Sequence, residues 1–237
     1  MKKDIDSSLL VTVCLSMNKK EEFFQYLEER KQLPKTNYHN LCVEEMKKAS
    51  MLEKKPTLLL HVCCVVCACY PIDFLKDYFD ITILFNNSNI YPKEEHDKRL
   101  EELKRFIKER YNDEIEVVVP HYDNEEYNKL LIDRADDPEG YKRCFICYEN
   151  RLDYAFSYAN EKHFDYFTTV MTFSRLKDSQ KINEIGKELS KKYETKYLFS
   201  DFKKNDGQLK SNELCELYNL YKQNYCGCIY SLNESHS

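Results

Sequence analysis

Short apolar runs alternate with longer helix-like segments along this chain, and that alternation limits the possible folds more than any other feature. Strand-like runs occupy residues 56–64, 80–92, 114–122, 166–174 and 195–202. Segments with apolar residues at helical spacing lie between them, at 71–79, 93–112, 136–164 and 179–193. Strands that alternate with helices are typical of βαβ units. We therefore predict an α/β fold in which helices flank a mostly parallel sheet.

The two ends of the chain depart from this central pattern. Residues 21–33 predict a helix that Pro34 ends, and residues 37–54 predict a second helix. Residues 211–231 predict a helix that turns at Gly227. We see no internal repeat and no Gly/Ser-rich linker. We expect a partly helical N-terminal extension, residues 1–36, and a single α/β domain, residues 37–237.

Composition narrows the class of protein. The 237 residues carry a net charge of −5, whereas nucleic-acid binders usually have a basic surface. No apolar run approaches the ~20 residues that span a bilayer, and the N-terminus lacks the pattern of a signal peptide. We expect a cytoplasmic protein with no membrane contact. Because disulfides are rare in that reducing compartment, the 11 cysteines need another explanation.

Eight of the cysteines fall into three groups, which are Cys63, Cys64, Cys67 and Cys69; Cys144 and Cys147; and Cys226 and Cys228. The first group follows a strand where a helix is expected to begin near Cys64, and a helix start favours thiolates. The others are a CxxC and a CxC whose Gly permits a tight turn. Three isolated cysteines, Cys14, Cys42 and Cys215, are interpreted as small buried hydrophobic residues.

Eight thiolates exceed the needs of one metal centre. A structural zinc takes four ligands, and an iron–sulfur cluster also takes four. The count favours two zincs, or one cluster with a second metal. Positive side chains also cluster locally, and we interpret each cluster as a solvated helix face. The largest comprises Lys98, Arg99, Lys104, Arg105, Lys108 and Arg110.

Several spaced motifs resemble one known family. They are LLLHVCCVVCACY, LFNNSNIYPKEEHDKRLEELKRF, PEGYKRCFICYENRLDYAFSYA, TTVMTFSRLKDSQKINEIGKEL and DFKKNDGQLKSNELCELYNLYKQNYCGCIYS. In this order they resemble the QueH-type epoxyqueuosine reductases, over roughly residues 37–231. The first ~35 residues lie outside the family pattern.

The resemblance implies an oxidoreductase of queuosine biosynthesis that reduces the epoxide of epoxyqueuosine to queuosine at the wobble position of tRNA. It implies a fold similar to the adenine-nucleotide α-hydrolases, a 4Fe–4S cluster and an adjacent single iron, with zinc as a possible substitute after purification. The implied partners are a tRNA with a GUN-type anticodon and an external electron donor. The implied ligands are Cys63, Cys64, Cys67, Cys144, Cys147, Cys226 and Cys228. Cys69 matches no family cysteine and is predicted to pack.

Removal of the epoxide oxygen as water needs proton donors, and three candidates lie beside motif residues: His61, Asp201 and Tyr230. Tentative substrate contacts are Thr168, Thr169 and Ser174 at a strand end, and Arg143 and Arg151 beside the CxxC. This chain departs from the family pattern at Val66, at Ser88, at 174–177 and at Lys222. These departures affect loop shape and contacts and remove no thiolate.

Two other functions stay open. An ATP-dependent tRNA sulfurtransferase would need a phosphate-cradling Gly loop after the first strand, yet no Gly precedes Gly140. A non-enzymatic, zinc-stabilised domain that binds tRNA or protein would be colourless, whereas an iron–sulfur protein absorbs broadly in the visible range.

Overall fold

The predicted parallel sheet is confirmed in the computed structural model, which describes residues 7–235, with side chains from residue 19 onward. Five parallel strands lie in the order β3-β2-β1-β4-β5. Their bounds are β1 Thr57–His61, β2 Asp80–Leu84, β3 Glu116–Val118, β4 Tyr166–Thr169 and β5 Lys196–Tyr197. β5 is therefore much shorter than the predicted run at 195–202.

β1 lies at the centre of the sheet because its side chains are apolar on both faces. Leu58, Leu59 and Leu60 are fully buried, and β1 pairs with β2 on one side and β4 on the other. His61 is in register with Leu84 of β2 and Thr169 of β4. The carboxyl ends of the three central strands therefore meet at one edge, where parallel α/β sheets bind ligands.

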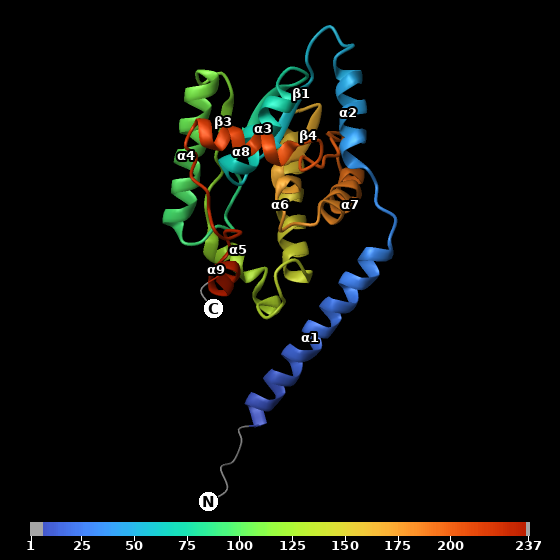
Figure 1. Ribbon diagram of the computed structural model, residues 1–237, viewed down its shortest axis with the longest axis vertical. Coiled ribbons are helices and arrows are strands. Elements are labelled where there is room, and N and C mark those ends of the chain that lie inside the picture. The colour runs from blue at the N-terminus through green and yellow to red at the C-terminus, as the bar shows by residue number, and fades with distance from the viewer. Residues whose placement is uncertain (1–6, 236–237) are drawn as a thin grey trace, which may run out of the picture.

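Helices cover both faces of this sheet (Figure 1). One apolar cluster holds α2 Tyr38–Ala49, α3 Val65–Leu75, α4 Lys93–Tyr111 and α8 Gly207–Leu217. The opposite cluster holds α6 Lys142–Glu161 and α7 Ser179–Leu189. Shorter elements complete the fold: α5 Asn124–Lys129, α9 Ile229–Ser235, η1 Ile132–Arg134, η2 Val170–Phe173 and η3 Ser190–Lys192.

Two predicted helices have different bounds. α3 begins at Val65, and Pro71 lies inside it rather than at its start. α3 is buried nearly all round and packs on α8 and α4, and this packing offsets the backbone hydrogen bond that Pro71 cannot donate. The prediction of one helix over 211–231 is wrong, because α8 ends at Leu217, Asn219 adopts a positive φ of 46°, and 218–228 is an irregular loop before α9.

The N-terminal segment forms one helix, α1 Ser7–Gln32, which is longer than the predicted 21–33 and projects from the body in Figure 1. Its second half is anchored to the start of α6 and α7. The ring of Phe23 packs on Tyr141, 5.2 Å between centroids, and Arg30 pairs with Asp178 and Glu184 at 2.7 Å each.

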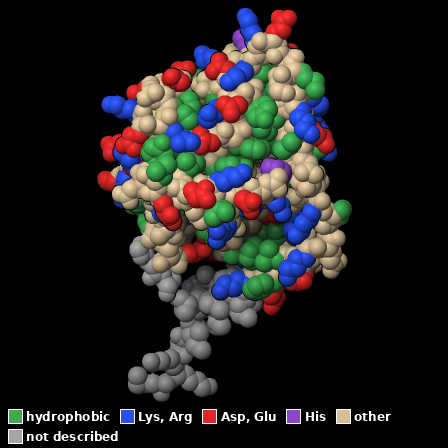
Figure 2. Space-filling model, turned by 45° about the horizontal axis from the view of Figure 1, so that its top comes forward, with side chains coloured by type: hydrophobic (Ala, Val, Ile, Leu, Met, Phe, Trp, Pro, Cys, Tyr) green, Lys and Arg blue, Asp and Glu red, His purple; other side chains and the backbone are tan. Residues whose placement is uncertain are grey.

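Among residues 7–235, no helix combines the length and hydropathy that a membrane crossing requires. On the face shown in Figure 2, acidic and basic side chains are interspersed among apolar ones. This agrees with the small net charge of −5.

Candidate metal centre

The carboxyl end of β1 carries three sulfur atoms in close contact. The strand ends at His61, and Cys64 is the N-cap of α3 in an extended conformation, with φ −167° and ψ 156°. Cys67 follows in the first turn of that helix. The sulfurs of Cys63, Cys64 and Cys67 all lie within 4.8 Å of one another, and all three residues are buried. We call these three residues the strand-end group.

The three thiols cannot all ionise freely at this spacing. Hydrogen bonds from Cys64 and Cys67, helped by the charges of Arg151 and Lys177, hold the pKa of Cys63 well below its ordinary value. The same contacts raise the pKa of Cys67 well above it, and raise that of Cys64 to about 12. One thiolate surrounded by two thiols is expected at neutral pH. A metal cation would supply the charge that lets all three lose their protons.

A second set of four cysteines comes from one helix and one loop. Cys144 and Cys147 lie in the first turns of α6, whereas Cys226 and Cys228 lie in the loop before α9. All four line one small cavity, which the side chains of Tyr148, Arg151 and Lys177 also line. Burial raises the pKa of Cys144 and of Cys228 to about 12 each. We call these four residues the helix-and-loop group.

Gly227 allows the loop to carry two cysteines so close together. Its φ is +128°, a conformation that other residues rarely adopt. A Cβ at this position would also lie 3.0 Å from Nη1 of Arg99. Both the backbone and the packing therefore require Gly between Cys226 and Cys228, as the CxC pattern predicted.

Buried cations connect the two groups. Nζ of Lys177 donates to Sγ of Cys226 at 3.1 Å. Burial opposes its charge, but the neighbouring sulfurs of Cys226, Cys63 and Cys67 outweigh burial, so the pKa of Lys177 lies well above its ordinary value. Arg151 is also buried and lies close to the sulfurs of Cys147 and Cys63. Fixed positive charge in a site without bulk water stabilises thiolates.

His61 belongs to the network that holds Arg151. Nη2 of Arg151 lies 3.2 Å from Nε2 of His61 and donates to Oδ1 of Asn87 at 2.6 Å. Nε2 also lies 3.3 Å from the carbonyl oxygen of Asn86. Because a guanidinium can only donate, the shorter contact with Arg151 favours Nε2 as the acceptor, and Nδ1 then donates to Oγ1 of Thr169 at 2.8 Å. Burial, with a contribution from Arg151, lowers the pKa of His61 to about 3, so the ring is neutral.

The other two predicted proton donors lie at different places. Tyr230 is half-buried beside Cys228, and its ring packs under the guanidinium of Arg143 at 4.6 Å. Burial raises the pKa of Tyr230, which keeps its hydroxyl protonated. Asp201 lies beyond β5, where Oδ2 accepts from Oγ of Ser179 at 3.0 Å. No contact described for Asp201 reaches a cysteine.

The predicted substrate contacts differ in their burial and in the hydrogen-bond partners that they already have. Oγ1 of Thr168 donates to the carbonyl of Leu198, and Oγ1 of Thr169 accepts from His61, so both buried hydroxyls have partners. Ser174 is half-buried in the loop before α7. Arg143 is buried and donates to the carbonyl of Ala135 at 2.7 Å.

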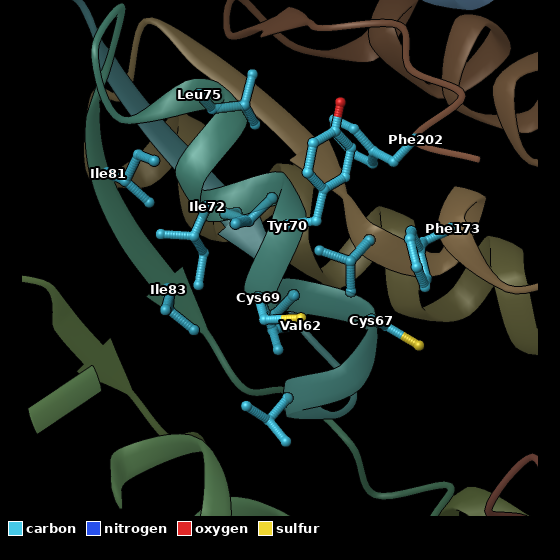
Figure 3. Packing of buried hydrophobic residues seen from close by; sticks show 14 of the residues in the cluster. Val62, Cys67, Cys69, Tyr70, Ile72, Leu75, Ile81, Ile83, Phe173 and Phe202 are labelled. Atoms are coloured by element: carbon cyan, nitrogen blue, oxygen red, sulfur yellow. The ribbon is translucent and has the colours of Figure 1, made fainter. Parts of the chain in front are cut away.

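The remaining cysteines lie in apolar surroundings. In Figure 3 the sulfur of Cys67 points away from the drawn cluster, whereas Cys69 lies among its apolar side chains. Sγ of Cys69 is 3.3 Å from Oγ of Ser211, and Cys215 lies on the same helix as Ser211. Cys42 is also buried, so Cys42, Cys69 and Cys215 all pack as predicted. The side chain of Cys14 lies outside the described residues.

Sequence reasoning missed three residues that contact the cysteine segments, Arg99, Lys177 and Gln223. The interpretation of Arg99 as part of a solvated helix face is wrong, because it is 1% exposed. A signal was present, since Arg99, Leu103 and Phe106 share one helical stripe. Gln223 donates from Nε2 to Sγ of Cys64 at 2.9 Å, and no local pattern indicates that contact.

The donor set fits thiolate-bound metal. Seven sulfurs lie on segments that share the cations Lys177, Arg151 and Arg99. Within the described residues, Nε of Arg151 is a buried donor that lacks a partner. An anionic metal–sulfur group among these cations would give that donor an acceptor and would balance the positive charges.

Comparison with known proteins places this arrangement in a family. The family model described as epoxyqueuosine reductase QueH matches residues 58–234. The QueH of Streptococcus pyogenes serotype M1 is 39% identical over 200 residues, covering 83% of this chain and 78% of its own. The QueH of Staphylococcus aureus strain Mu50 is 39% identical, covering 75% and 76%. The QueH of Thermotoga maritima is 32% identical, covering 75% and 91%.

The family match over residues 58–234 takes in the whole sheet except Thr57 of β1, and every segment that carries the seven predicted ligands. The resemblance inferred from the motifs is therefore confirmed, as is the enzyme class. The chain belongs to the epoxyqueuosine reductase QueH family of oxidoreductases.

Proposed function

We propose that this protein reduces the epoxide of epoxyqueuosine to the alkene of queuosine in the wobble nucleoside of a tRNA with a GUN-type anticodon. Family membership supports the reaction. The observation that carries the assignment is the convergence of thiols from α3, α6 and the loop before α9 around shared buried cations. The proposed catalytic domain is residues 37–237, with 1–36 as an extension.

The reaction sets a definite chemical requirement. The epoxide takes up two electrons and two protons, both C–O bonds break, and the oxygen leaves as water. The exposed side chains that the structure describes offer no clear source of two electrons. The proposal therefore includes an external reductant. Because tRNA is the substrate, the proposal places the enzyme in the cytoplasm.

We propose that Cys63, Cys64, Cys67, Cys144, Cys147, Cys226 and Cys228 hold a 4Fe–4S cluster and one further iron. When bound, this pair would supply electrons one at a time and a Lewis acid for the epoxide oxygen. Lys177 and Arg151 would balance the added negative charge.

The proposed proton donors differ in suitability. Tyr230 is half-buried next to Cys228 and protonated, which suits direct donation. His61 donates through Nδ1 to Thr169, so its proposed part is to hold Arg151 in place beside Cys63 and Cys147. Asp201 lies beyond β5 and contacts Ser179 and Lys203. Its proposed part is to hold the loop that follows β5.

The proposed substrate contacts follow the same distinction. Ser174 is half-buried and available to the nucleoside or a phosphate. Thr168, Thr169, Arg143 and Arg151 are buried with partners, so we propose that they shape the pocket around the base. The ring of Tyr230, fixed against Arg143, offers a surface on which an unstacked base can lie.

Anaerobic purification with iron and sulfide analysis tests the cofactor, and conversion of epoxyqueuosine-containing tRNA under a chemical reductant tests the reaction. We expect a brown protein that yields queuosine. A colourless zinc protein without turnover would favour the binding domain, and ATP-dependent incorporation of sulfur into tRNA would favour the sulfurtransferase. The double variant Cys226→Ala/Cys228→Ala is expected to lose iron and activity, and full retention of both would contradict the ligand set.

A further inference from the structure

The loop that carries Cys226 and Cys228 has no regular structure of its own. It joins α8 to α9 across residues 218–228, and its backbone forms no strand or helix. Two cysteines in such a segment take a fixed direction only if other groups hold the backbone. The side chains that hold this loop therefore decide where two of the seven thiols point.

Arg99 of α4 contacts the backbone of this loop directly. Nη1 donates to the carbonyl of Cys226 at 3.1 Å, and Nη2 donates to the carbonyl of Tyr225 at 3.3 Å. Its guanidinium also lies over the ring of Tyr225, 5.3 Å from the centroid. Arg99 is 1% exposed, so water does not compete for these bonds. A planar fork that holds two successive carbonyls fixes orientation as well as position.

Glu95, on the same helix, holds Arg99 in place, and we call these two residues the clamp. Nε of Arg99 donates to Oε1 of Glu95 at 2.6 Å, and the hydroxyl of Tyr221 donates to Oε2 at 2.9 Å. The backbone N–H of Tyr91 donates to the carbonyl of Gly227 at 2.7 Å. Three successive peptide groups of the loop are thus tied to the start of α4 and the residues before it.

We propose that Arg99 is a positioning residue that sets the direction of Cys226 and Cys228 and keeps a fixed positive charge beside the sulfurs of Cys64 and Cys63. This inference rests on the proposed metal site, but its geometric part concerns the protein alone. Gly227 supports it, because the glycine leaves room for Nη1 at the centre of the CxC turn.

Arg105 provides a matched control on the same helix. It pairs with Glu102 at 2.6 Å, and its Nη2 also donates to two loop carbonyls, those of Tyr218 at 3.0 Å and Asn219 at 3.4 Å. Its side chain is 37% exposed, and its two carbonyls precede the cysteine turn. Arg105→Gln therefore removes a similar bond set from the same loop without touching the turn.

The first measurement uses metal-free, reduced full-length protein, and follows alkylation of each cysteine by iodoacetamide with mass spectrometry. Arg99→Gln is expected to raise the rates at Cys226 and Cys228 about tenfold, because local opening of the loop becomes easier. Arg99→Lys keeps the charge but loses the fork, so a smaller rise is expected. Arg105→Gln is expected to leave both rates within about twofold of the wild type.

Equal rates in Arg99→Gln and the wild type, with native circular dichroism, would overturn the proposal. Equal acceleration by Arg99→Gln and Arg105→Gln would also overturn it, because general anchoring of the loop would then explain the effect. If Arg99→Gln does not fold, Arg99→Lys decides: wild-type rates at both cysteines contradict the clamp. None of these outcomes depends on iron or on epoxyqueuosine, so they are separate from a failure of the proposed function.

The second measurement addresses the charge, in iron-loaded protein. Loss of a buried positive charge beside thiolate-bound iron disfavours the reduced form. The midpoint potential of Arg99→Gln is expected to be more negative than that of the wild type, and Arg99→Lys is expected to lie closer to the wild type. An unchanged midpoint potential in Arg99→Gln would contradict the proposed role of the charge. Only the role of Arg99 in holding the loop would then stand.

Discussion

The two cysteine groups are held in different ways. The strand-end group spans the short connection between β1, which is buried from Leu58 to His61, and the buried helix α3, so the regular hydrogen bonds of these two elements fix its backbone at both ends. The helix-and-loop group combines the first turns of α6 with an irregular loop, and its four cysteines are only partly buried. Regular structure positions the first group, whereas individual side chains such as Arg99 and Lys177 position half of the second. The first group is therefore preformed, and the second is assembled by long-range contacts.

The largest effect is expected in the preformed group. Cys63→Ser/Cys67→Ser removes two sulfurs from a site whose backbone cannot move to compensate. We expect iron content to fall steeply and activity to drop at least about 100-fold, more than the loss from an outer contact. Iron analysis and turnover of epoxyqueuosine tRNA measure this. Cys69→Ala, a buried cysteine two positions further along α3, serves as the control and should keep its iron.

A smaller effect is expected from a cation that supports the assembled group. Lys177→Met leaves Sγ of Cys226 without its donor while keeping much of the side-chain volume. Activity is expected to fall about 10–100-fold, as for other groups that contact metal ligands. Steady-state turnover at saturating tRNA measures the loss. Lys204→Met is the exposed control, and an equal loss in both variants would mean that Lys177 acts through tRNA rather than through Cys226.

Acid is expected to weaken the preformed edge of the sheet in the metal-free protein. His61 has a pKa of about 3 in the fold, against about 6.5 when unfolded. The unfolded chain therefore binds the extra proton between these values. His61 contributes its full stability above pH 6.5, and that contribution shrinks by up to about 1.4 kcal/mol per pH unit as the pH falls towards 3.

Urea unfolding at several pH values measures this slope. His61→Gln should flatten it, whereas His121→Gln, at an exposed loop position, should leave it unchanged. A wild-type slope in His61→Gln would show that other groups account for the acid sensitivity.

The smallest effect is expected where α1 meets the body. Arg30→Ala removes ion pairs with Asp178 and Glu184, both at 2.7 Å, and Asp178 caps α7 directly after Lys177. Because the pairs are partly exposed, a loss of about 1 kcal/mol in unfolding free energy is expected. Thermal denaturation measures it. Lys31→Ala, whose partner Glu28 is exposed like itself, should cost less, and an equal cost would contradict the anchoring role of Arg30.

The parts of the fold that depend on local pattern could be predicted from sequence. Leu58, Leu59 and Leu60 indicate a central strand, and the cysteines that follow it indicate a helix that begins near Cys64. The loop at 218–228 could not be predicted, because residues more than 100 positions away hold it. Arg99 illustrates why. Its position on the apolar stripe of α4 indicates burial, but its charge favours the opposite inference unless its carbonyl partners are known.

The site components could be named from motifs, but their supporting charges could not. Lys177 is the last residue of the motif SRLK. Nothing in that motif indicates a contact with Cys226, which lies 49 residues later. His61 follows the leucines and suggests a proton donor. Its register opposite Thr169 and its contact with Arg151 make it a neutral member of a network. Such roles depend on which charged groups lie close together in the buried site. The order of residues along the chain does not show this.

The distance along the chain between the two groups has a consequence for biosynthesis. The strand-end group precedes Cys226 by about 160 residues. At typical translation speeds the intervening segment takes roughly 10–30 s to make. During that interval a nascent chain presents three neighbouring thiols with no partner loop to enclose them. Insertion of the iron that we propose must therefore either wait for release from the ribosome or begin on a half-built site that needs protection from stray metal.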